Sequence, residues 1–322
     1  MESNVNALTI STALNTVTLD KQALTAISEE ATGDISITTV KVDASTLQDK
    51  AKQAAADRPV YEVKVTSEGD VISSLGNGSI KVSTPYTLKP GEDANNIVIS
   101  YISDSGEAVK VSHSQYNAET GLVTFETANP SKYIIESESV NFKDNSGWYK
   151  DYVNYLAARD VVKGDNGAFS PEANVTRAEF VQLLANLSGA DLSKYKNSEF
   201  TDVSEKDWFN KAVQWANEKG IAQGSDGKFD PTANITRQDM AVMIARYADK
   251  VEKYISEDKN ASVNFSDSTK IAEYAKNAVM AMQKAGIISG KENNTFAPTD
   301  DATRAEAAKM IAVLLQDILG QK

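Results

Sequence analysis

The sequence feature that most constrains this fold is a helix start that occurs three times. A Thr-Arg pair recurs at Arg177, Arg237 and Arg304, in steps of 60 and 67 residues. In each copy an acidic residue follows the threonine by three positions. This is the spacing of a capping box, which predicts a helix that begins directly after the threonine. Each arginine then takes the first helical position, where a cation costs about 0.3–1 kcal/mol, so it should have a compensating partner.

The Thr-Arg helix closes a longer repeated unit. Each unit opens with Phe-x-Asp, continues into an amphipathic helix and then reaches a Gly turn that ends in Phe-x-Pro, and this turn is one residue longer in the third copy. The three turns span residues 163–171, 223–231 and 289–298. A helix–turn–helix unit of this size cannot bury its apolar faces alone, so we expect the three units to pack on one another.

The first 140 residues have a different period. Apolar and polar residues alternate there with period two, which predicts strands. The predicted strands are 59–66, 79–84, 96–102, 122–127 and 132–137, and the predicted helices are 20–31 and 43–56. We therefore expect a multidomain chain: a mainly-β, β-sandwich-like domain with short helices over 1–140, followed by an all-α bundle of three repeats.

Composition excludes several classes of function. The chain has no cysteine and one histidine, which leaves little material for thiolate chemistry, zinc sites or histidine catalysis. Its net charge of −12 argues against nucleic acid as a partner. No paired-carboxylate, phosphate-loop or nucleophile motif is present, and the turns lack the alternating acids of a calcium loop. We expect no catalytic residue, no metal and no cofactor.

Targeting signals are not visible either. Residues 1–20 lack the basic and apolar regions of a signal peptide, and no run approaches the roughly 18 apolar residues of a membrane span. We therefore expect no membrane insertion. If the protein is secreted, its leader is absent from this sequence.

The repeated unit resembles the S-layer homology domain family. The resemblance rests on the Phe-x-Asp start, the tryptophan soon after it, the Gly turn with Phe-x-Pro and the Thr-Arg-Ala-Glu motif. It covers about 142–322, with expected repeats at 141–198, 199–262 and 263–322. It implies a three-pronged bundle with grooves between adjacent repeats that binds pyruvylated secondary cell-wall polysaccharide, attached to peptidoglycan. The strand-rich first half resembles accessory domains that often precede such repeats.

The resemblance also assigns roles to residues that match the family's motif. Arg177, Arg237 and Arg304 would hold the ketal carboxylate beside free helix N–H groups. Asp144, Asp202 and Asp267 would accept hydrogen bonds from sugar hydroxyls or amide N–H groups. Trp148 and Trp208 would stack on a sugar ring, and Gly164, Gly224 and Gly290 would let the backbone approach closely.

Structural alternatives stay open for these residues. Each arginine could instead pair with its own capping acid or with the Phe-x-Asp carboxylate. The tryptophans could be plain core residues, and the aspartates could be helix N-caps. Under the binding interpretation, removing an arginine should barely change folding.

The third repeat departs from the pattern. Ile271 or Tyr274 stands where a tryptophan is expected, and Asp300 and Asp301 precede Thr303. These acids are expected to neutralise Arg304, so the third arginine should contribute least to binding. In the second repeat, Gln238 replaces the alanine of the motif.

The function expected from the sequence is a non-catalytic cell-wall anchor. The anchor would tether an S-layer or other exported protein at the bacterial surface. Self-association within an S-layer stays open. The alternatives are a protein–protein scaffold of the cell envelope, or the anchor of an enzyme whose catalytic part lies outside this chain.

Overall fold

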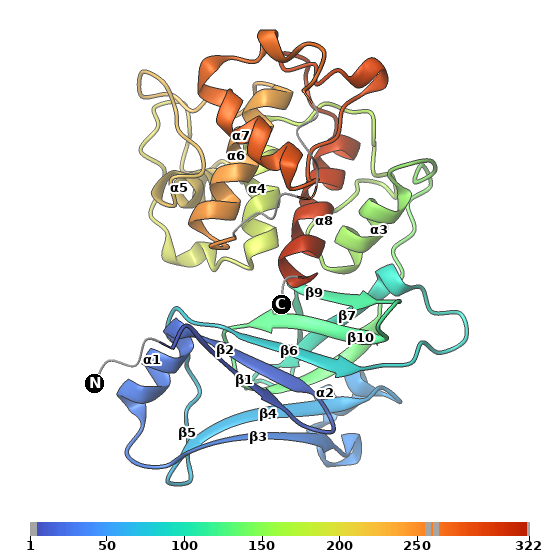
Figure 1. The fold of residues 1–322 in the computed structure, drawn as a ribbon, viewed down its shortest axis with the longest axis vertical. Coiled ribbons are helices and arrows are strands. Elements are labelled where there is room, and N and C mark those ends of the chain that lie inside the picture. The colour runs from blue at the N-terminus through green and yellow to red at the C-terminus, as the bar shows by residue number, and fades with distance from the viewer. Residues whose placement is uncertain (1–4, 255–258, 260–263, 321–322) are drawn as a thin grey trace. The chain divides into compact units, whose positions relative to one another are not determined.

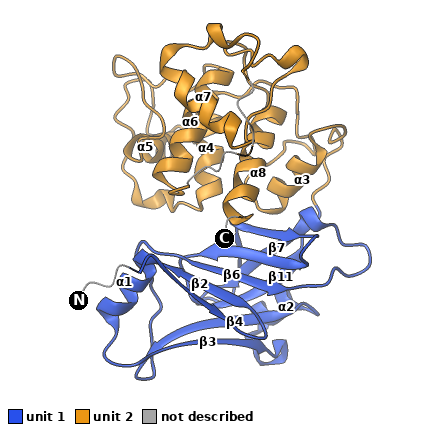
Figure 2. Cartoon of the chain, in the orientation of Figure 1, with its two compact units in different colours: residues 1–139 blue, residues 140–322 orange. Residues whose placement is uncertain are grey.

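The computed structural model describes residues 5–254, 259 and 264–320. The chain divides into two compact units, residues 1–139 and 140–322, which are coloured separately in Figure 2. Each unit has its own buried hydrophobic cluster, so each is described by itself.

The first unit contains two antiparallel sheets. One has the strand order β1-β2-β6-β10-β9 and the other has the order β3-β4-β11-β7-β8, with β5 paired to β4 (Figure 1). The strands are β1 Ala7–Ser11, β2 Thr16–Asp20, β3 Ile35–Val42, β4 Val60–Ser67, β5 Asp70–Val71, β6 Ile80–Pro85, β7 Ile97–Ile102, β8 Ala108–Val111, β9 Ser114–Asn117, β10 Leu122–Thr127 and β11 Lys132–Ser137.

Both sheets contribute to one core. Val82 of β6 and Phe125 of β10 come from the first sheet, while Val65 of β4 and Ile99 of β7 come from the second, and all belong to the same buried cluster. Alternating residues of these strands face that cluster, which is why period two was readable in the sequence. The five predicted strands are confirmed to within one residue at each end.

The helices of this unit are short. Helix α1, Lys21–Glu30, begins after Asp20, whose Oδ1 accepts a 2.6 Å hydrogen bond from the Ala23 N–H. The helix predicted at 43–56 is divided into a 3₁₀ turn, η1 Ala44–Thr46, and α2 Asp49–Ala55. A further 3₁₀ turn, η2, spans Ala94–Asn96.

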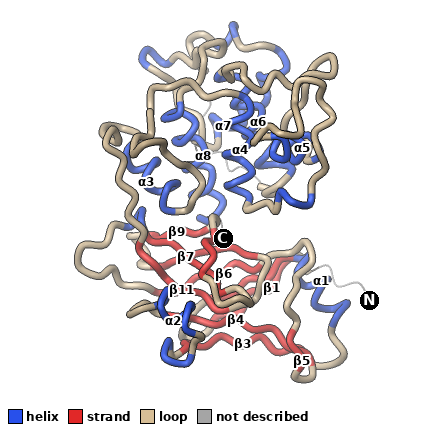
Figure 3. Tube along the Cα trace, turned by 180° about the vertical axis from the view of Figure 1, so that it is seen from behind, coloured by secondary structure: helices blue, strands red, loops and turns tan. Residues whose placement is uncertain are grey.

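The second unit is built from helices and long loops, as Figure 3 shows. The helices are α3 Lys150–Ala158, α4 Arg177–Ser188, α5 Asn210–Glu218, α6 Arg237–Lys250, α7 Glu273–Lys284 and α8 Arg304–Gly320, with 3₁₀ turns η3 Leu192–Lys194, η4 Ser268–Lys270 and η5 Glu292–Asn294. The loops carry isolated β-bridges, such as the one between Thr176 and Asn234. Throughout the described residues, every helix is too short or too polar to span a membrane.

The Thr-Arg helices begin where the capping pattern predicts. Thr176 forms a complete capping box with Glu179: its Oγ1 accepts from the Glu179 N–H at 3.2 Å, and Glu179 Oε2 accepts from the Thr176 N–H at 2.8 Å. Thr303 and Glu306 repeat both bonds, at 3.2 and 3.1 Å. These caps satisfy N–H groups at the start of each helix.

Helices pair across repeats. Helix α4 of the first repeat packs against α5 of the second, α6 of the second packs against α7 of the third, and α8 of the third returns to α3 of the first. Figure 1 shows α3 lying beside α8, although more than 140 residues separate their starts. The last repeat therefore closes the unit on the first.

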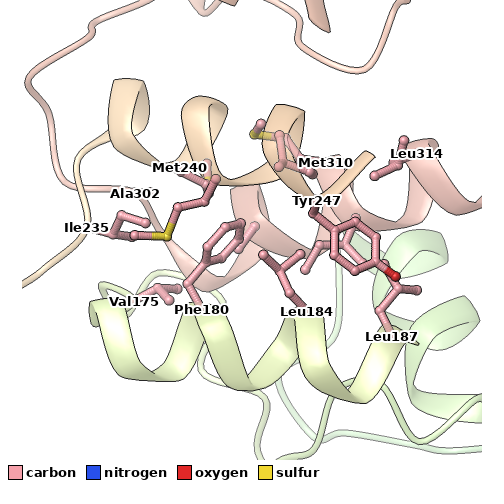
Figure 4. Packing of buried hydrophobic residues seen from close by; sticks show 14 of the residues in the cluster. Val175, Phe180, Leu184, Leu187, Ile235, Met240, Tyr247, Ala302, Met310 and Leu314 are labelled. Atoms are coloured by element: carbon pink, nitrogen blue, oxygen red, sulfur yellow. The ribbon is translucent and has the colours of Figure 1, made fainter. Parts of the chain in front are cut away.

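A ring of backbone hydrogen bonds joins the three repeats just ahead of the Thr-Arg helices. The Val175 N–H donates to the Ala302 carbonyl, the Ala302 N–H to the Ile235 carbonyl, and the Ile235 N–H to the Val175 carbonyl, each at 2.9 Å. All three side chains are fully buried. Figure 4 shows them together at one end of the shared core, with Phe180 and Met240 close by.

Each Phe-x-Asp aspartate fixes the Gly turn of its own repeat. The two oxygens of Asp202 accept hydrogen bonds from the N–H groups of Phe229 and Asp230, both at 2.8 Å. Asp144 and Asp267 make the equivalent pairs with the turns at 169–170 and 296–297, at 2.7–2.8 Å. None of the three caps a helix with its side chain, so that alternative is wrong.

These hydrogen bonds favour the ionised carboxylates. The Phe169 N–H lowers the pKa of Asp144, against an opposing effect of burial. Burial raises the pKa of Asp202 and of Asp267, but the two turn N–H groups outweigh it, and both pKa values lie below the ordinary value.

The pKa shifts predict a loss of stability in acid. Because the folded pKa values lie below the unfolded ones, the unfolded chain binds more protons between the two values, so stability is present above about pH 4 and falls as pH decreases through the folded values. Urea unfolding of residues 140–322 at pH 7, 4 and 3 measures this. Asp202→Asn should reduce the pH dependence of the unfolding free energy, by no more than about 1 kcal/mol because the site is partly exposed. A profile identical to that of the unchanged protein would contradict this role for Asp202.

The cyclic pairing of helices predicts which fragments fold. Residues 140–322 should form a helical unit with a cooperative thermal transition, because their buried cluster contains only their own residues. Residues 140–262 should give no cooperative transition, since they lack α7 and α8, the partners of α6 and α3. Circular dichroism during heating checks both. A cooperative melt of 140–262 at the temperature of the longer fragment would show that the closure is dispensable.

Candidate functional site

The three arginines at the helix starts contact the next repeat rather than their own. Each Nε donates to the carbonyl of the turn phenylalanine in that repeat, and each guanidinium lies over the ring of the same phenylalanine. The Nε–O distances are 2.9 Å for Arg177 to Phe229, 2.7 Å for Arg237 to Phe296 and 2.8 Å for Arg304 to Phe169. The distances from guanidinium carbon to ring centroid are 4.9, 5.3 and 4.7 Å in the same order.

The N–H groups at these helix starts are not free. The Arg177 N–H donates to the Ala233 carbonyl at 2.9 Å and the Ala178 N–H donates to the Pro231 carbonyl at 3.0 Å. The first two N–H groups of α6 donate in the same way to the carbonyls of residues 300 and 298. Those of α8 donate to the carbonyls of residues 173 and 171. The expectation of open N–H groups beside each arginine is therefore wrong, because the next repeat already caps the helix.

The arginines differ in their ionic partners. Arg237 is buried, and its Nη1 lies 2.5 Å from Oε1 of Glu306, the capping acid of the third repeat. The Nη2 atoms of Arg177 and Arg304 donate to backbone carbonyls of Gln223 and Lys163. Within the part of the chain that the structure describes, neither of these two arginines has a carboxylate within 4.0 Å. Their nearest partners are backbone carbonyls and the ring of the turn phenylalanine.

The neutralised arginine is thus Arg237 and not Arg304. Asp301 Oδ2 accepts hydrogen bonds from the side-chain amides of Asn174 and Asn234, at 3.0 and 2.7 Å. Asp300 Oδ2 lies 3.4 Å from Lys291 Nζ. The expectation that these two acids neutralise Arg304 is wrong. Burial lowers the pKa of Arg304, with the charges of Glu179 and Asp144 opposing that effect.

The two motif tryptophans lie on the surface. The side chains of Trp148 and Trp208 are 55% and 64% exposed, and each makes an edge contact with the aromatic residue that follows it. The core alternative is wrong for both. In the third repeat Ile271 is a core residue, while Tyr274 is 61% exposed and donates its hydroxyl to Asp239 Oδ1 at 2.7 Å.

The motif glycines serve the packing of their own repeat. A Cβ at Gly164 would lie 2.4 Å from Phe142 Cε1, and one at Gly224 would lie 2.1 Å from the Lys228 carbonyl oxygen. At Gly290 the nearest atom would be 3.1 Å away. At Gly164 and Gly224 the close approach of the turn and of the Phe-x-Asp ring is enough to require a residue without a side chain, while the contact at Gly290 is tight but less severe.

One groove brings several of these residues together. It has a volume of about 540 Å³ and takes Trp148 from the first repeat, Arg237 from the second and Gly290, Lys291, Glu306 and Lys309 from the third. We call it the Trp148 groove. Lys309 Nζ lies 5.8 Å from the centre of the Trp148 ring. An exposed ring beside cationic side chains can hold a sugar face and an adjacent anionic group.

Two residues of this groove were missed by sequence reasoning. Lys309 follows Arg304 by five positions, so it lies nearly one and a half turns further along the same helix, and Lys291 directly follows Gly290. Their fixed spacing from Arg304 and Gly290, two residues already assigned to the site, could have identified both lysines. The ion pair that Glu306 forms with Arg237 of the second repeat could not be predicted from the sequence, because capping of its own helix already explained an acidic residue at this position.

In the stretches that the structure describes, no group of three or more His, Asp or Glu side chains could hold a metal ion.

Comparison with known proteins gives the family. The profile of the S-layer homology domain matches three segments of the chain, residues 142–181, 199–241 and 264–308. Each segment runs from a Phe-x-Asp start into the Thr-Arg helix, so it contains the residues that build the contacts between repeats.

Named relatives are similar to a large part of the chain. The chain is 30% identical over 260 residues to an amylopullulanase of Thermoanaerobacterium thermosulfurigenes, which is 79% of this chain and 14% of the relative. It is 38% identical over 192 residues to the exoglucanase XynX of Acetivibrio thermocellus, 59% of this chain and 17% of the relative. It is 32% identical over 149 residues to a cellulosome-anchoring protein of the same species, 45% of this chain and 33% of the relative.

The matched segments are short parts of longer proteins. The chain spans between 14% and 33% of the length of these three relatives. Three consecutive matches, each carrying the same helix start and the same contacts to its neighbour, agree with the repeat read from the sequence. Residues 142–308 of this chain contain three tandem S-layer homology domains.

Proposed function

We propose that this chain is a cell-surface anchoring module that binds pyruvylated secondary cell-wall polysaccharide through the grooves of its C-terminal unit. The observation that carries the proposal is the Trp148 groove, where an exposed tryptophan and cationic side chains from three tandem S-layer homology domains meet. The repeats at 141–198, 199–262 and 263–322 would form one helical bundle, held at the extracellular face of a bacterial wall.

The names of the relatives favour an anchoring module over a catalytic one. An amylopullulanase, an exoglucanase and a cellulosome-anchoring protein differ in what their names describe, yet each shares a similar segment with this chain. A segment common to such proteins is better explained by attachment than by a shared reaction. We therefore propose that the chain is non-catalytic, and that any enzyme associated with it lies in other sequence.

The three arginines divide into two roles under this proposal. Arg237 is committed to Glu306 and to the Phe296 carbonyl, so it holds the second and third repeats together. Arg177 and Arg304 keep a positive charge without a carboxylate partner among the described residues, and they would attract an anionic ligand. Asp144, Asp202 and Asp267 would support the groove walls through the turns that they fix.

The proposal predicts ketal-dependent sedimentation with cell walls. The chain should sediment with purified walls that carry the polysaccharide, and much less after mild acid has removed the pyruvate ketals, because the anionic group is then lost. Denaturant should release the bound protein. Trp148→Ala and Trp208→Ala should each weaken binding about tenfold with little change in melting temperature, since both rings are exposed.

Trp215 supplies the control for the tryptophan variants. Its side chain is 1% exposed in the core, so Trp215→Ala should cost about 3–5 kcal/mol of stability. Equal sedimentation with intact and acid-treated walls would contradict recognition of the ketal and favour the protein–protein scaffold. Unchanged binding in both surface tryptophan variants would remove those rings from the site.

The division of roles predicts different costs for two arginine variants. Arg237→Ala leaves Glu306 without its nearest cation and a buried carbonyl without its donor, so it should cost about 2–4 kcal/mol. This corresponds to a fall of about 5–15 °C in the melting temperature of a unit of this size. Arg177→Ala is the matched control, because its side chain is half-buried and has no ion pair in the described structure. Equal melting temperatures for the two variants would show that the Glu306 pair contributes nothing.

A further inference from the structure

Two lysines that line the Trp148 groove, Lys291 and Lys309, stand at positions where the other repeats have different residues. The residues equivalent to Lys309 are Gln182 in the first repeat and Val242 in the second, because each follows the Thr-Arg arginine of its repeat by five positions. Asp165 and Ser225 likewise stand where the third repeat has Lys291, directly after each motif glycine. The third repeat alone offers lysines at both positions.

The arginine of this groove is already neutralised. Arg237 lies 2.5 Å from Glu306, and its Nε is bound to the Phe296 carbonyl. Lys291 Nζ lies 3.5 Å from the same Glu306 and 3.4 Å from Asp300, so its charge is partly met as well. An incoming anion would have to displace Glu306 before it could reach Arg237, which is buried beneath that contact.

Lys309 is placed differently. Its Nζ donates to Ser289 Oγ at 2.6 Å and lies 5.8 Å from the Trp148 ring centre, and it has no carboxylate within 4.0 Å among the described residues. Burial and the nearby charge of Arg237 lower the pKa of Lys309, while Glu306 opposes this. A negative group bound here would relieve the repulsion between the two cations and favour the protonated amine.

We infer that Lys309, assisted by Lys291, is the residue that selects an anionic sugar in the Trp148 groove, in place of the motif arginine. The inference rests on the proposed function and specifies how one groove performs it. A sugar ring stacked on Trp148 brings a carboxylate at its edge within reach of Lys309 Nζ. The third repeat, which lacks the motif tryptophan, thus contributes the main cation of the site.

The test is isothermal titration of the full chain with fragments of pyruvylated wall polysaccharide, before and after acid removal of the ketals. Lys309→Gln installs the residue that the first repeat has and should weaken binding about tenfold or more, the scale of one lost charge-assisted contact. Lys309→Arg should stay within about threefold, because it keeps the charge. Melting temperatures should change little for either variant.

Two controls separate position from total charge. Lys276 lies on α7, outside the groove, and pairs with Glu273 at 2.5 Å, so Lys276→Gln should leave the affinity unchanged. The double variant Lys309→Gln, Gln182→Lys keeps the net charge of the chain. Its affinity should remain reduced, since Asp165 stands in place of Lys291 beside the new lysine.

The outcomes separate this inference from the proposed function. If the unchanged chain does not bind the intact fragments, or binds acid-treated fragments equally well, the proposed function fails and the inference fails with it. If the unchanged chain binds with ketal dependence but Lys309→Gln binds equally well, only the inference is overturned. Full affinity in the double variant would also overturn it, because net charge and not position would then decide binding.

Discussion

The structure of the C-terminal unit depends on the capping of each Thr-Arg helix by the repeat that follows it. The first two N–H groups of α4, α6 and α8 donate to carbonyls of the neighbouring repeat, and the arginine side chain donates to a third carbonyl there. A helix start normally leaves such donors for water or for a ligand. Here they are used to join one repeat to the next, and the ring closes because the third repeat contacts the first.

This arrangement explains an arginine at the positive end of a helix. The unfavourable interaction with the helix dipole is about 0.3–1 kcal/mol, whereas a hydrogen bond from a charged donor to a carbonyl is worth about 1.5–3 kcal/mol. The turn phenylalanine adds a cation–π contact on the same side chain. The arginines therefore contribute to assembly of the unit whether or not they bind a ligand, and a binding defect in an arginine variant needs a measurement of stability beside it.

Local patterns were predictable and contacts across repeats were not. The capping spacing identified the starts of α4, α6 and α8, and period two identified β4, β6, β7, β10 and β11, because these signals come from residues close in sequence. The exposed strand β3 gave no clear alternation, and the helix at 43–56 was not expected to divide. The pairing of Arg237 with Glu306 joins residues 69 positions apart, so charge counting beside Thr303 assigned the neutralised arginine wrongly. Spacing alone placed Trp148 and Trp208 on the apolar stripe of a predicted helix, whereas both precede the helices α3 and α5 and are exposed.

In the Trp148 groove, which is lined by residues of all three repeats, Arg237 holds the fold together and Lys309 would bind the anionic group of the ligand. A crystal structure of the chain with a pyruvylated saccharide tests this most directly. We expect a sugar ring stacked on Trp148, its carboxylate within about 3 Å of Lys309 Nζ, and an unbroken contact between Arg237 and Glu306. A carboxylate bound to Arg237, with Glu306 displaced, would contradict it.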